Sequence, residues 1–300
     1  MSMIVGRKTK NGLNRMNGFD YLNYAQMLVI IILMLFPLYY CFIVSISDGG
    51  AVTRGEVLFW PKGSDYTAYR AVLENSQIGG AYLNTIYYTG LGTCVNMFLT
   101  SMCAYPLCRP HLKGRKLFNA LFVATMFISG GMIPLYLQVK SLHLIDTVWA
   151  VILPTGISTY NMIIMRTFFS TIPEELHEAA EIDGASQFQT FRLIVLPLST
   201  TILATLILFY AVSHWNSFMP ALLYLNSMDK MPLQMVIRKM VIDSDIASMT
   251  TTSSSSSETL LTESKIKYAV VIISVLPMLI VYPFLQKYFV KGVMIGSVKG

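Results

Sequence analysis

The chain has 300 residues, of which 54% are hydrophobic and only 13% are charged, and its mean hydropathy is +0.56. A soluble protein cannot bury that much apolar surface, and several charge-free runs approach the ~20 residues that a helix needs to cross a bilayer. The composition therefore predicts an all-α polytopic membrane protein, and the net charge of +6 fits basic loops that orient such a protein better than nucleic-acid binding.

Six apolar segments are predicted to be membrane-spanning helices. Their runs are continuous, unlike the alternating segments of ~10 residues that form a membrane β-barrel. A basic arm over residues 1–24 precedes a transmembrane domain over residues 25–289, and a tail over residues 290–300 follows it. The predicted spans are residues 27–46, 81–107, 117–137, 147–165, 194–215 and 268–284.

The loops between these spans differ in charge. Residues 47–80 and 216–267 are long and mixed in charge, and the second contains a low-complexity Ser/Thr tract over residues 250–257. We expect residues 216–267 to form an external loop. The shorter loops on the other side are rich in Lys and Arg, which predicts that both termini and the loop over residues 166–193 are cytoplasmic.

The loop over residues 166–193 carries the signals of two short helices. Gly184 tolerates the positive φ that ends a helix, and Ser186 is expected to cap the helix that follows. Three residues before them predict a capped helix start, with a cap, a proline in the first turn and a capping-box acid. These three are Thr171, Pro173 and Glu174.

We find no catalytic or metal-binding motif in the sequence. His177-Glu178 begins like the HExxH motif of zinc proteases, but Glu181 occupies the position of the second histidine. Residues 292–299 are glycine-rich yet lack the spacing of a phosphate-binding loop. The four histidines and four cysteines are scattered. We therefore expect neither an enzyme nor a metal or cofactor bound by this chain.

The polar loop carries a family resemblance. Six of its residues resemble the EAA signature of ATP-binding cassette (ABC) importer permeases in order, spacing and placement between two spans. They are Glu178, Ala179, Ala180, Asp183, Gly184 and Ala185. Residues 128–134 and the tail over residues 290–300 resemble the polysaccharide-type, LplC-like branch of the maltose-permease-like carbohydrate permeases. The resemblance runs from about residue 22 onward and implies the six-helix type I ABC importer permease fold.

In that family the signature forms a coupling helix that enters a cleft of a separate cytoplasmic ATPase. The resemblance implies that Glu178 and Asp183 offer acceptors to donors of the ATPase. It implies that Ala179 and Ala180 keep the helix thin and that Gly184 makes the turn. ATP and Mg are then expected in the ATPase subunit and not in this chain.

The resemblance also implies a function and a set of partners. The chain is expected to be a permease subunit of an ATP-driven importer in a bacterial cell membrane. An external lipid-anchored or soluble solute-binding protein would deliver an oligosaccharide to it. A second homologous permease subunit, a cytoplasmic ATPase dimer and membrane lipid would complete the assembly, without nucleic acid.

Polar and aromatic residues within or beside the spans are candidates for the substrate path, because polar groups are costly there and often functional. Trp215 and Tyr160 could stack on sugar rings, and Trp215 with Asn216 is the preferred pair. Interhelical hydrogen bonding and interfacial anchoring are the competing explanation. The remaining candidates are Asn84, Asn96, Asn161, Arg166 and His214.

Three alternatives stay open. A peptide or amino-acid permease of the same ATP-driven class would share the coupling motif. An ion-coupled secondary transporter would need acidic residues within its spans, and none of the six predicted spans contains Asp or Glu. A membrane-embedded scaffold without transport is the third. Uptake that requires ATP hydrolysis by a co-purifying ATPase would favour an ATP-driven importer over the secondary transporter and the scaffold.

Overall fold

The computed structural model describes residues 18–250, 265–281 and 283, and for residues 243–250 it describes the backbone alone. Most of the predicted N-terminal arm, the Ser/Thr tract and the tail over residues 290–300 lie outside the described residues. Every regular element within them is helical, which confirms the all-α prediction.

The helices follow one another with short connections. They are α1 (Gly18–Ile46), α2 (Gly49–Thr53), α3 (Thr67–Glu74), α4 (Ser76–Cys108), α5 (Arg115–Phe127), α6 (Met132–Ser141), α7 (Val148–Ile152), η1 (Leu153–Thr155), α8 (Thr159–Phe169), α9 (Glu174–Ile182), α10 (Gln187–Thr190), the π-helical η2 (Phe191–Val195), α11 (Leu196–Leu198), α12 (Thr200–Trp215), α13 (Met219–Tyr224), η3 (Met228–Lys230) and α14 (Leu233–Thr250). Residues 265–281 form a further helix.

Among the described residues, two unbroken helices are long and apolar enough to cross a membrane. They are α1, with 29 residues, and α4, with 33. They coincide with the predicted spans at residues 27–46 and 81–107, and both extend beyond them. At 1.5 Å per residue α4 is about 50 Å long, more than the ~30 Å hydrocarbon core. The long α4 can therefore span the bilayer and still project beyond it.

The next three predicted spans are bent. The α5–α6 pair turns by 115°, the pair of α7–η1 with α8 by 55°, and the pair of α10–α11 with α12 by 84°. The first bend lies at residues 128–131, where Gly131 has a φ of +85°. The predicted spans at residues 117–137, 147–165 and 194–215 are thus mostly helical, and each contains a break that redirects the chain.

The segment over residues 216–267 is not the loop that we predicted. Helices α13, η3 and α14 occupy most of its described part, and the last helix already begins at residue 265. The apolar residues of α14 explain the difference, because Leu233 is buried in a cluster with Ala269 and Val270 of the last helix. The predicted sixth span, residues 268–284, is helical as far as it is described.

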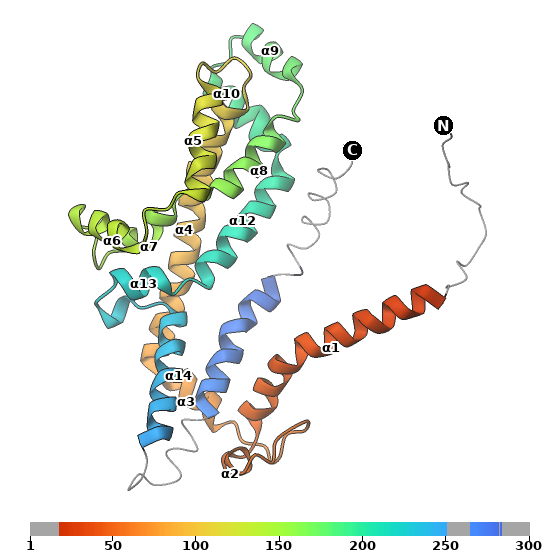
Figure 1. Ribbon diagram of the computed structural model, residues 1–300, viewed down its shortest axis with the longest axis vertical. Coiled ribbons are helices and arrows are strands. Elements are labelled where there is room, and N and C mark those ends of the chain that lie inside the picture. Colours follow the sequence, from red (N-terminus) through yellow and green to blue (C-terminus); the bar gives the residue numbers. More distant parts are fainter. Residues whose placement is uncertain (1–17, 251–264, 282, 284–300) are drawn as a thin grey trace.

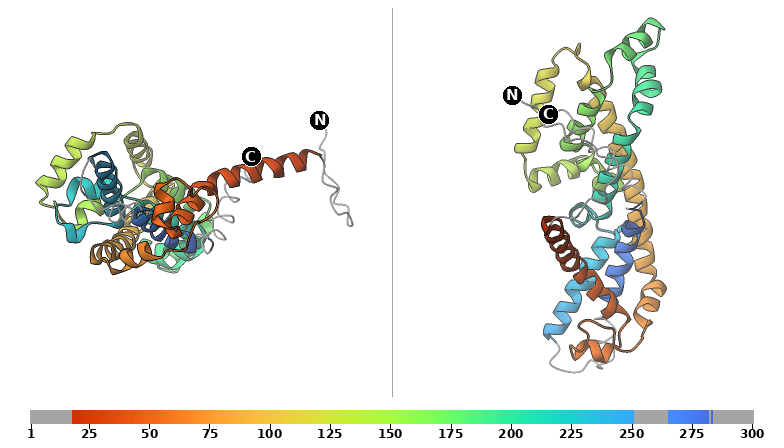
Figure 2. Two further views of the ribbon diagram at one scale, coloured as in Figure 1. Left: turned by 90° about the horizontal axis from the view of Figure 1, so that it is seen from below. Right: turned by 90° about the vertical axis from the view of Figure 1, so that its right-hand side faces the viewer.

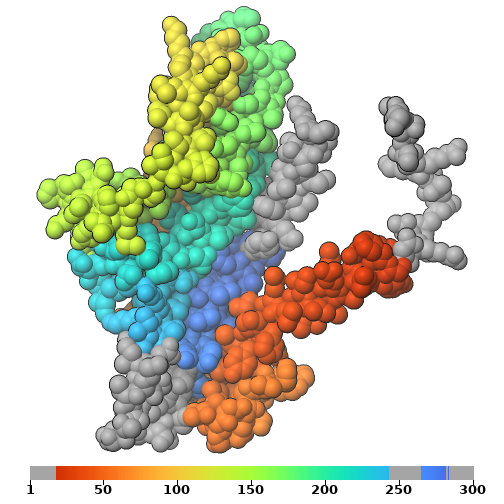
Figure 3. Space-filling model, in the orientation of Figure 1, coloured from red at the N-terminus to blue at the C-terminus, as the bar shows by residue number. Residues whose placement is uncertain are grey.

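The molecule is elongated, with α4 running along most of its length (Figure 1). Helices α9 and α10 lie at one end, which we call the α9 end. Helices α2, α3 and the far end of α14 lie at the opposite end, and Figure 2 shows the same separation from the side. Helix α1 leans away from the rest of the chain (Figures 1 and 3).

The main core joins α4, α8 and α12 toward the α9 end. Ala104, Met162 and Leu206 are among its fully buried side chains. A hydrogen bond between the Thr100 and Tyr210 hydroxyls, 2.7 Å apart, links α4 to α12 inside it. Polar links between helices are expected within a membrane, where water cannot satisfy these groups. The core therefore holds the long α4 rigidly beside its neighbours.

Candidate functional site

Helix α9 begins without the cap that we predicted. Its N-cap position is Pro173, and no side chain caps the helix there. The Thr171 hydroxyl instead donates to the Phe168 carbonyl at 2.7 Å, because Thr171 still belongs to the turn that ends α8. The predicted Thr171 cap and capping box are thus wrong. Acidic Glu174 and Glu175 in the first turn complement the helix dipole instead.

The turn after α9 follows the prediction. Gly184 has a φ of +78°, which an L side chain rarely adopts. The Ala185 amide donates back to the Ala180 carbonyl at 2.9 Å and helps to close the helix end. Ser186 then caps α10 in a reciprocal capping box with Gln189. The chain therefore forms the expected helix, turn and helix.

One face of α9 is exposed along the length of the helix. Glu175, Glu178 and Ile182 are exposed and share one side of the helix at its 3.6-residue period. Ile182 is 86% exposed, which is unusual for a large apolar side chain. We call these three residues the α9 outer face. Ile182 is not among the residues predicted from the sequence, although a large apolar residue between Glu181 and Asp183 was the available signal.

The signature residues divide between this face and the interior. Ala179 and Asp183 are exposed beside the outer face, as the prediction requires. Ala180 is only 6% exposed, because it packs toward the same chain. Its small side chain serves the internal packing of α9, and the expectation that Ala179 and Ala180 keep the helix thin stays a prediction.

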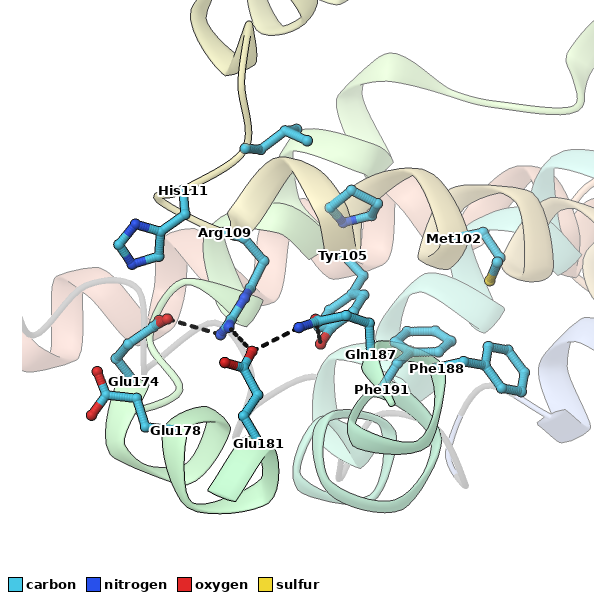
Figure 4. A pocket seen from close by; sticks show the side chains of 12 residues that line it. Met102, Tyr105, Arg109, His111, Glu174, Glu178, Glu181, Gln187, Phe188 and Phe191 are labelled. Atoms are coloured by element: carbon cyan, nitrogen blue, oxygen red, sulfur yellow. Dashed lines mark hydrogen bonds and ion pairs between the residues drawn. The ribbon is translucent and has the colours of Figure 1, made fainter. Parts of the chain in front are cut away.

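The face of α9 next to the outer face is held to the end of α4 by Arg109. The guanidinium contacts Glu174 of the first turn at 2.9 Å and Glu181 of the last turn at 3.2 Å. Figure 4 shows both carboxylates converging on it. In the sequence, Arg109 stands out only as one of several basic residues after the predicted second span. The sequence nevertheless contains a signal for this contact. Glu174 and Glu181 are seven residues apart and therefore lie on one helix face, and an arginine follows the end of the second predicted span.

The same contacts surround a cavity of about 640 Å³ between the end of α4, α9 and α10 (Figure 4). Phe188 and Phe191 form its apolar side, and three of the glutamates of α9 form its acidic side. His177 is on the buried side of α9. Burial is the main cause that lowers its pKa below the ordinary 6.5, and the positive charge of Arg109 is the second. His177 is thus neutral at neutral pH and adds no positive charge to this acidic helix.

The preferred substrate-path residue, Trp215, is buried. It is 5% exposed, its indole N–H donates to the Ser274 carbonyl at 3.1 Å, and its ring meets the edge of Tyr82. It therefore offers neither an open ring face nor a free donor in this conformation. The competing explanation, interhelical packing and hydrogen bonding, accounts for Trp215.

The other candidates are dispersed. Asn84 donates to the carbonyls of Asp229 and Met231 at the end opposite α9, while Asn216 donates to its own helix at Val212. Asn161 is buried beside its exposed neighbour Tyr160 on α8. Neither the cavity beside α9 nor the apolar groove beside α1 is lined by any of the five main candidates, which are Trp215, Asn216, Asn161, Tyr160 and Asn84.

Three further candidates also have structural partners or packing. The Asn96 amide donates to the Thr155 carbonyl, Arg166 donates to Asn119, and His214 is buried against Gly92. Among the described residues, no three His, Cys, Asp or Glu side chains lie close enough to hold a metal ion.

Comparison with known proteins gives consistent matches. Residues 12–295 match the family model described as "Binding-protein-dependent transport system inner membrane component". Protein LplC of Bacillus subtilis (strain 168) is 45% identical over 88% of this chain and 89% of its own length. The polygalacturonan/rhamnogalacturonan transport system permease protein YtcP of the same organism is 42% identical over 94% of this chain and 98% of its own.

A solved structure matches as well. It is a chain from the crystal structure of a bacterial ABC transporter involved in the import of the acidic polysaccharide alginate. The TM-score is 0.82 at 33% sequence identity, and the match covers 94% of this chain and 100% of that one. The likeness therefore extends over nearly the entire described fold, including its bent helices.

Proposed function

The chain belongs to the family of binding-protein-dependent transport system inner membrane components, and we propose that it is the permease half that couples ATP hydrolysis in a separate subunit to oligosaccharide import. Members of this family are membrane transport components and not enzymes. ATP is hydrolysed by a separate ATPase, so this chain must receive its work through a contact.

The observation that carries the proposal is the α9 outer face. Glu178 and Ile182 combine an acceptor with an exposed apolar side chain on a short helix held at one end of the molecule. Interfaces between proteins commonly bury an apolar centre within a polar rim. The outer face thus offers the ATPase an apolar contact at Ile182 and acceptors at Glu178 and Asp183, while Gly184 makes the turn.

This role predicts which end of the molecule is cytoplasmic and which is external. The loop that joins α4 to α5 lies at the α9 end and is basic, which supports a cytoplasmic position for that end. Its basic residues are Arg109, Lys113, Arg115 and Lys116. The end that holds α2, α3 and α14 then faces outward, toward the solute-binding protein, and both termini are cytoplasmic.

The substrate proposal rests on the relatives. YtcP is named for polygalacturonan and rhamnogalacturonan, and the matching structure is described as an importer of acidic alginate. We therefore propose that uronate-containing oligosaccharides are the first substrates to test. A peptide or amino-acid substrate, which the sequence left open, has no support from these names.

Isolation of the complex tests the assembly. A tag on this chain should co-purify a second permease, an ATPase and a solute-binding protein from the native membrane. Glu178→Lys should leave the chain in the membrane but abolish ATP-dependent uptake, because it places a cation where the ATPase meets an acceptor. Lys113→Glu reverses a charge at the same end without touching α9 and is the matched control. Normal ATPase recovery together with normal uptake in Glu178→Lys would refute the assignment.

A further inference from the structure

Arg109 joins the end of α4 to both ends of α9. It is the C-cap residue of α4, and its side chain is only 14% exposed although it ends a long helix. Its two terminal nitrogens reach opposite ends of α9, one at Glu174 and the other at Glu181. These two acids are about 10 Å apart along the helix axis. A planar guanidinium can hold two carboxylates at once, which an ammonium group cannot match.

The link continues into α10 and returns to α4. Glu181 Oε1 also accepts from Gln187 Nε2 at 2.7 Å, and Gln187 Oε1 accepts from the Tyr105 hydroxyl at 3.2 Å. Tyr105 lies one turn before Arg109 on α4, and its ring packs on Phe191 with centroids 5.0 Å apart. Ion pairs and hydrogen bonds between side chains thus link α4, α9 and α10 in a closed ring. The apolar contact between Tyr105 and Phe191 lies next to it.

Helix α4 is suited to carry a displacement onward. It is the longest helix among the described residues and packs against α8, α12 and α14. Thr100 is bonded to Tyr210 of α12, and Asn96 is bonded to the Thr155 carbonyl at the bend before α8. Asn84 reaches the Asp229 carbonyl at the opposite end. A shift of the α9 end of α4 would therefore reach helices along the whole molecule.

We propose that Arg109 is a positioning residue that locks α9 to the end of α4, so that motion imposed on α9 passes to the transmembrane helices. The proposal rests on the proposed function, because it takes the ATPase as the source of that motion. The Arg109 network uses Glu174 and Glu181, whereas the proposed contact with the ATPase uses Ile182 and Glu178 of the outer face. Transmission and docking are thus assigned to different residues on neighbouring faces of one nine-residue helix.

Loss of Arg109 should be tolerated by the fold. Glu174 and Glu181 are 36% and 49% exposed, so water can solvate both carboxylates once the guanidinium is gone. The apolar contact between Tyr105 and Phe191 also remains. An Arg109→Gln chain should consequently insert, fold and retain its outer face, and the effect of the substitution can be assigned to the missing link.

Hydrogen exchange on the complex tests the proposal without knowledge of the sugar. The complex is purified by a tag on this chain, and backbone exchange is compared with and without ATP and vanadate. In the unmodified chain, nucleotide should slow exchange in α9 and change it in residues 100–108 of α4. In Arg109→Gln the response of α9 should persist while that of α4 falls at least severalfold. Arg109→Lys should give an intermediate α4 response, because a single nitrogen can hold only one carboxylate firmly.

Lys113→Gln removes one positive charge from the same loop and should leave both responses unchanged. An α4 response in Arg109→Gln equal to that of the unmodified chain would overturn the proposal. So would loss of the ATPase from the Arg109→Gln complex, since Arg109 would then serve docking. If the unmodified chain showed no α9 response, the proposed function itself would fail. If it showed an α9 response without an α4 response, the transmission proposal alone would fail.

Discussion

At the scale of single residues, α4 and α12 approach each other closely at Gly92. A Cβ at this position would lie 2.6 Å from Nε2 of His214, a separation that real Cβ atoms essentially never show. His214 is buried and has little room to retreat. Small residues at helix crossings permit such approaches within membranes. Gly92 is therefore required by packing, whereas Gly90 is not, because a Cβ there would meet no heavy atom within 4 Å.

Gly92→Ala should consequently destabilise the chain by about 1–3 kcal/mol through overpacking. The measurement is the thermal unfolding midpoint of the purified chain in detergent. Gly90→Ala, two residues away on the same helix, should cause no loss. Adding His214→Ala to Gly92→Ala should recover part of the lost stability, because it removes the clashing ring. Equal midpoints for the two glycine variants would contradict this account.

Asp65 gives a residue-scale prediction about pH. Its hydrogen bond and ion pair with Lys265 lower its pKa from 3.8 to about 2. Folding thus favours the charged form of Asp65. The stabilisation from this contact is present above pH 3.8 and is lost as the pH falls through about 2. Asp65→Asn should lower the unfolding midpoint near neutral pH and flatten its dependence on pH in that acidic window.

The exposed pair of Arg70 and Glu74 supplies the control for Asp65. Both of its side chains are largely in water, and such pairs contribute little to stability. Glu74→Gln should therefore leave the acidic part of the pH profile unchanged. A profile of Asp65→Asn that matches the unmodified chain would show that the Lys265 contact does not stabilise the fold.

At the scale of elements, the best-defined local signal is the cap of α10. The Ser186 hydroxyl accepts from the Gln189 backbone N–H, and the Gln189 side-chain oxygen accepts from the Ser186 backbone N–H. Ser186→Ala should cost about 1 kcal/mol. This corresponds to about fivefold faster hydrogen exchange at the start of α10. Ser186→Asp keeps a side-chain acceptor and should exchange as the unmodified chain does. Unchanged exchange in Ser186→Ala would contradict the cap.

The elements that sequence reasoning recovered are those with local causes. Ser186 and Gly184 act through their own backbone, so their signals lie within a few residues of each other. The Thr171 cap failed because the end of α8 claimed that hydroxyl first. Arg109 could not be recognised from composition, because its partners lie 65 and 72 positions later in the chain and only the fold brings them together.

The same difference between local causes and contacts with distant residues explains which spans were predicted well. Apolar length predicted α1 and α4 well, because a straight helix needs no information beyond its own sequence. It could not predict the 84° turn before α12, although Pro197 and the π-helical η2 lie beside that turn. The helices within residues 216–267 were missed for a related reason. Their stability comes from packing on distant residues such as Ala269, which a local hydropathy reading does not see.

At the scale of the whole molecule, α1 makes little contact with the other helices. Only 11% of its most apolar window is buried within the chain, and it leans away from the other helices (Figure 3). An almost entirely apolar groove of about 790 Å³ separates α1 from the helix over residues 265–281. Because the chain is open on this side, it cannot by itself enclose a path for a polysaccharide fragment. ABC importer permeases work with a second permease subunit, which could close this side.

We therefore expect α1 to contact that second permease. A photo-crosslinking residue at Leu35, which lines the groove and is exposed, should capture a second polypeptide of permease size in the native membrane. The same crosslinking residue at Val44, which is buried near the C-terminal end of α1, should capture none. Capture of lipid alone at Leu35 would show that the bilayer fills the groove, and the transport path would then have to be closed along a different face of the chain.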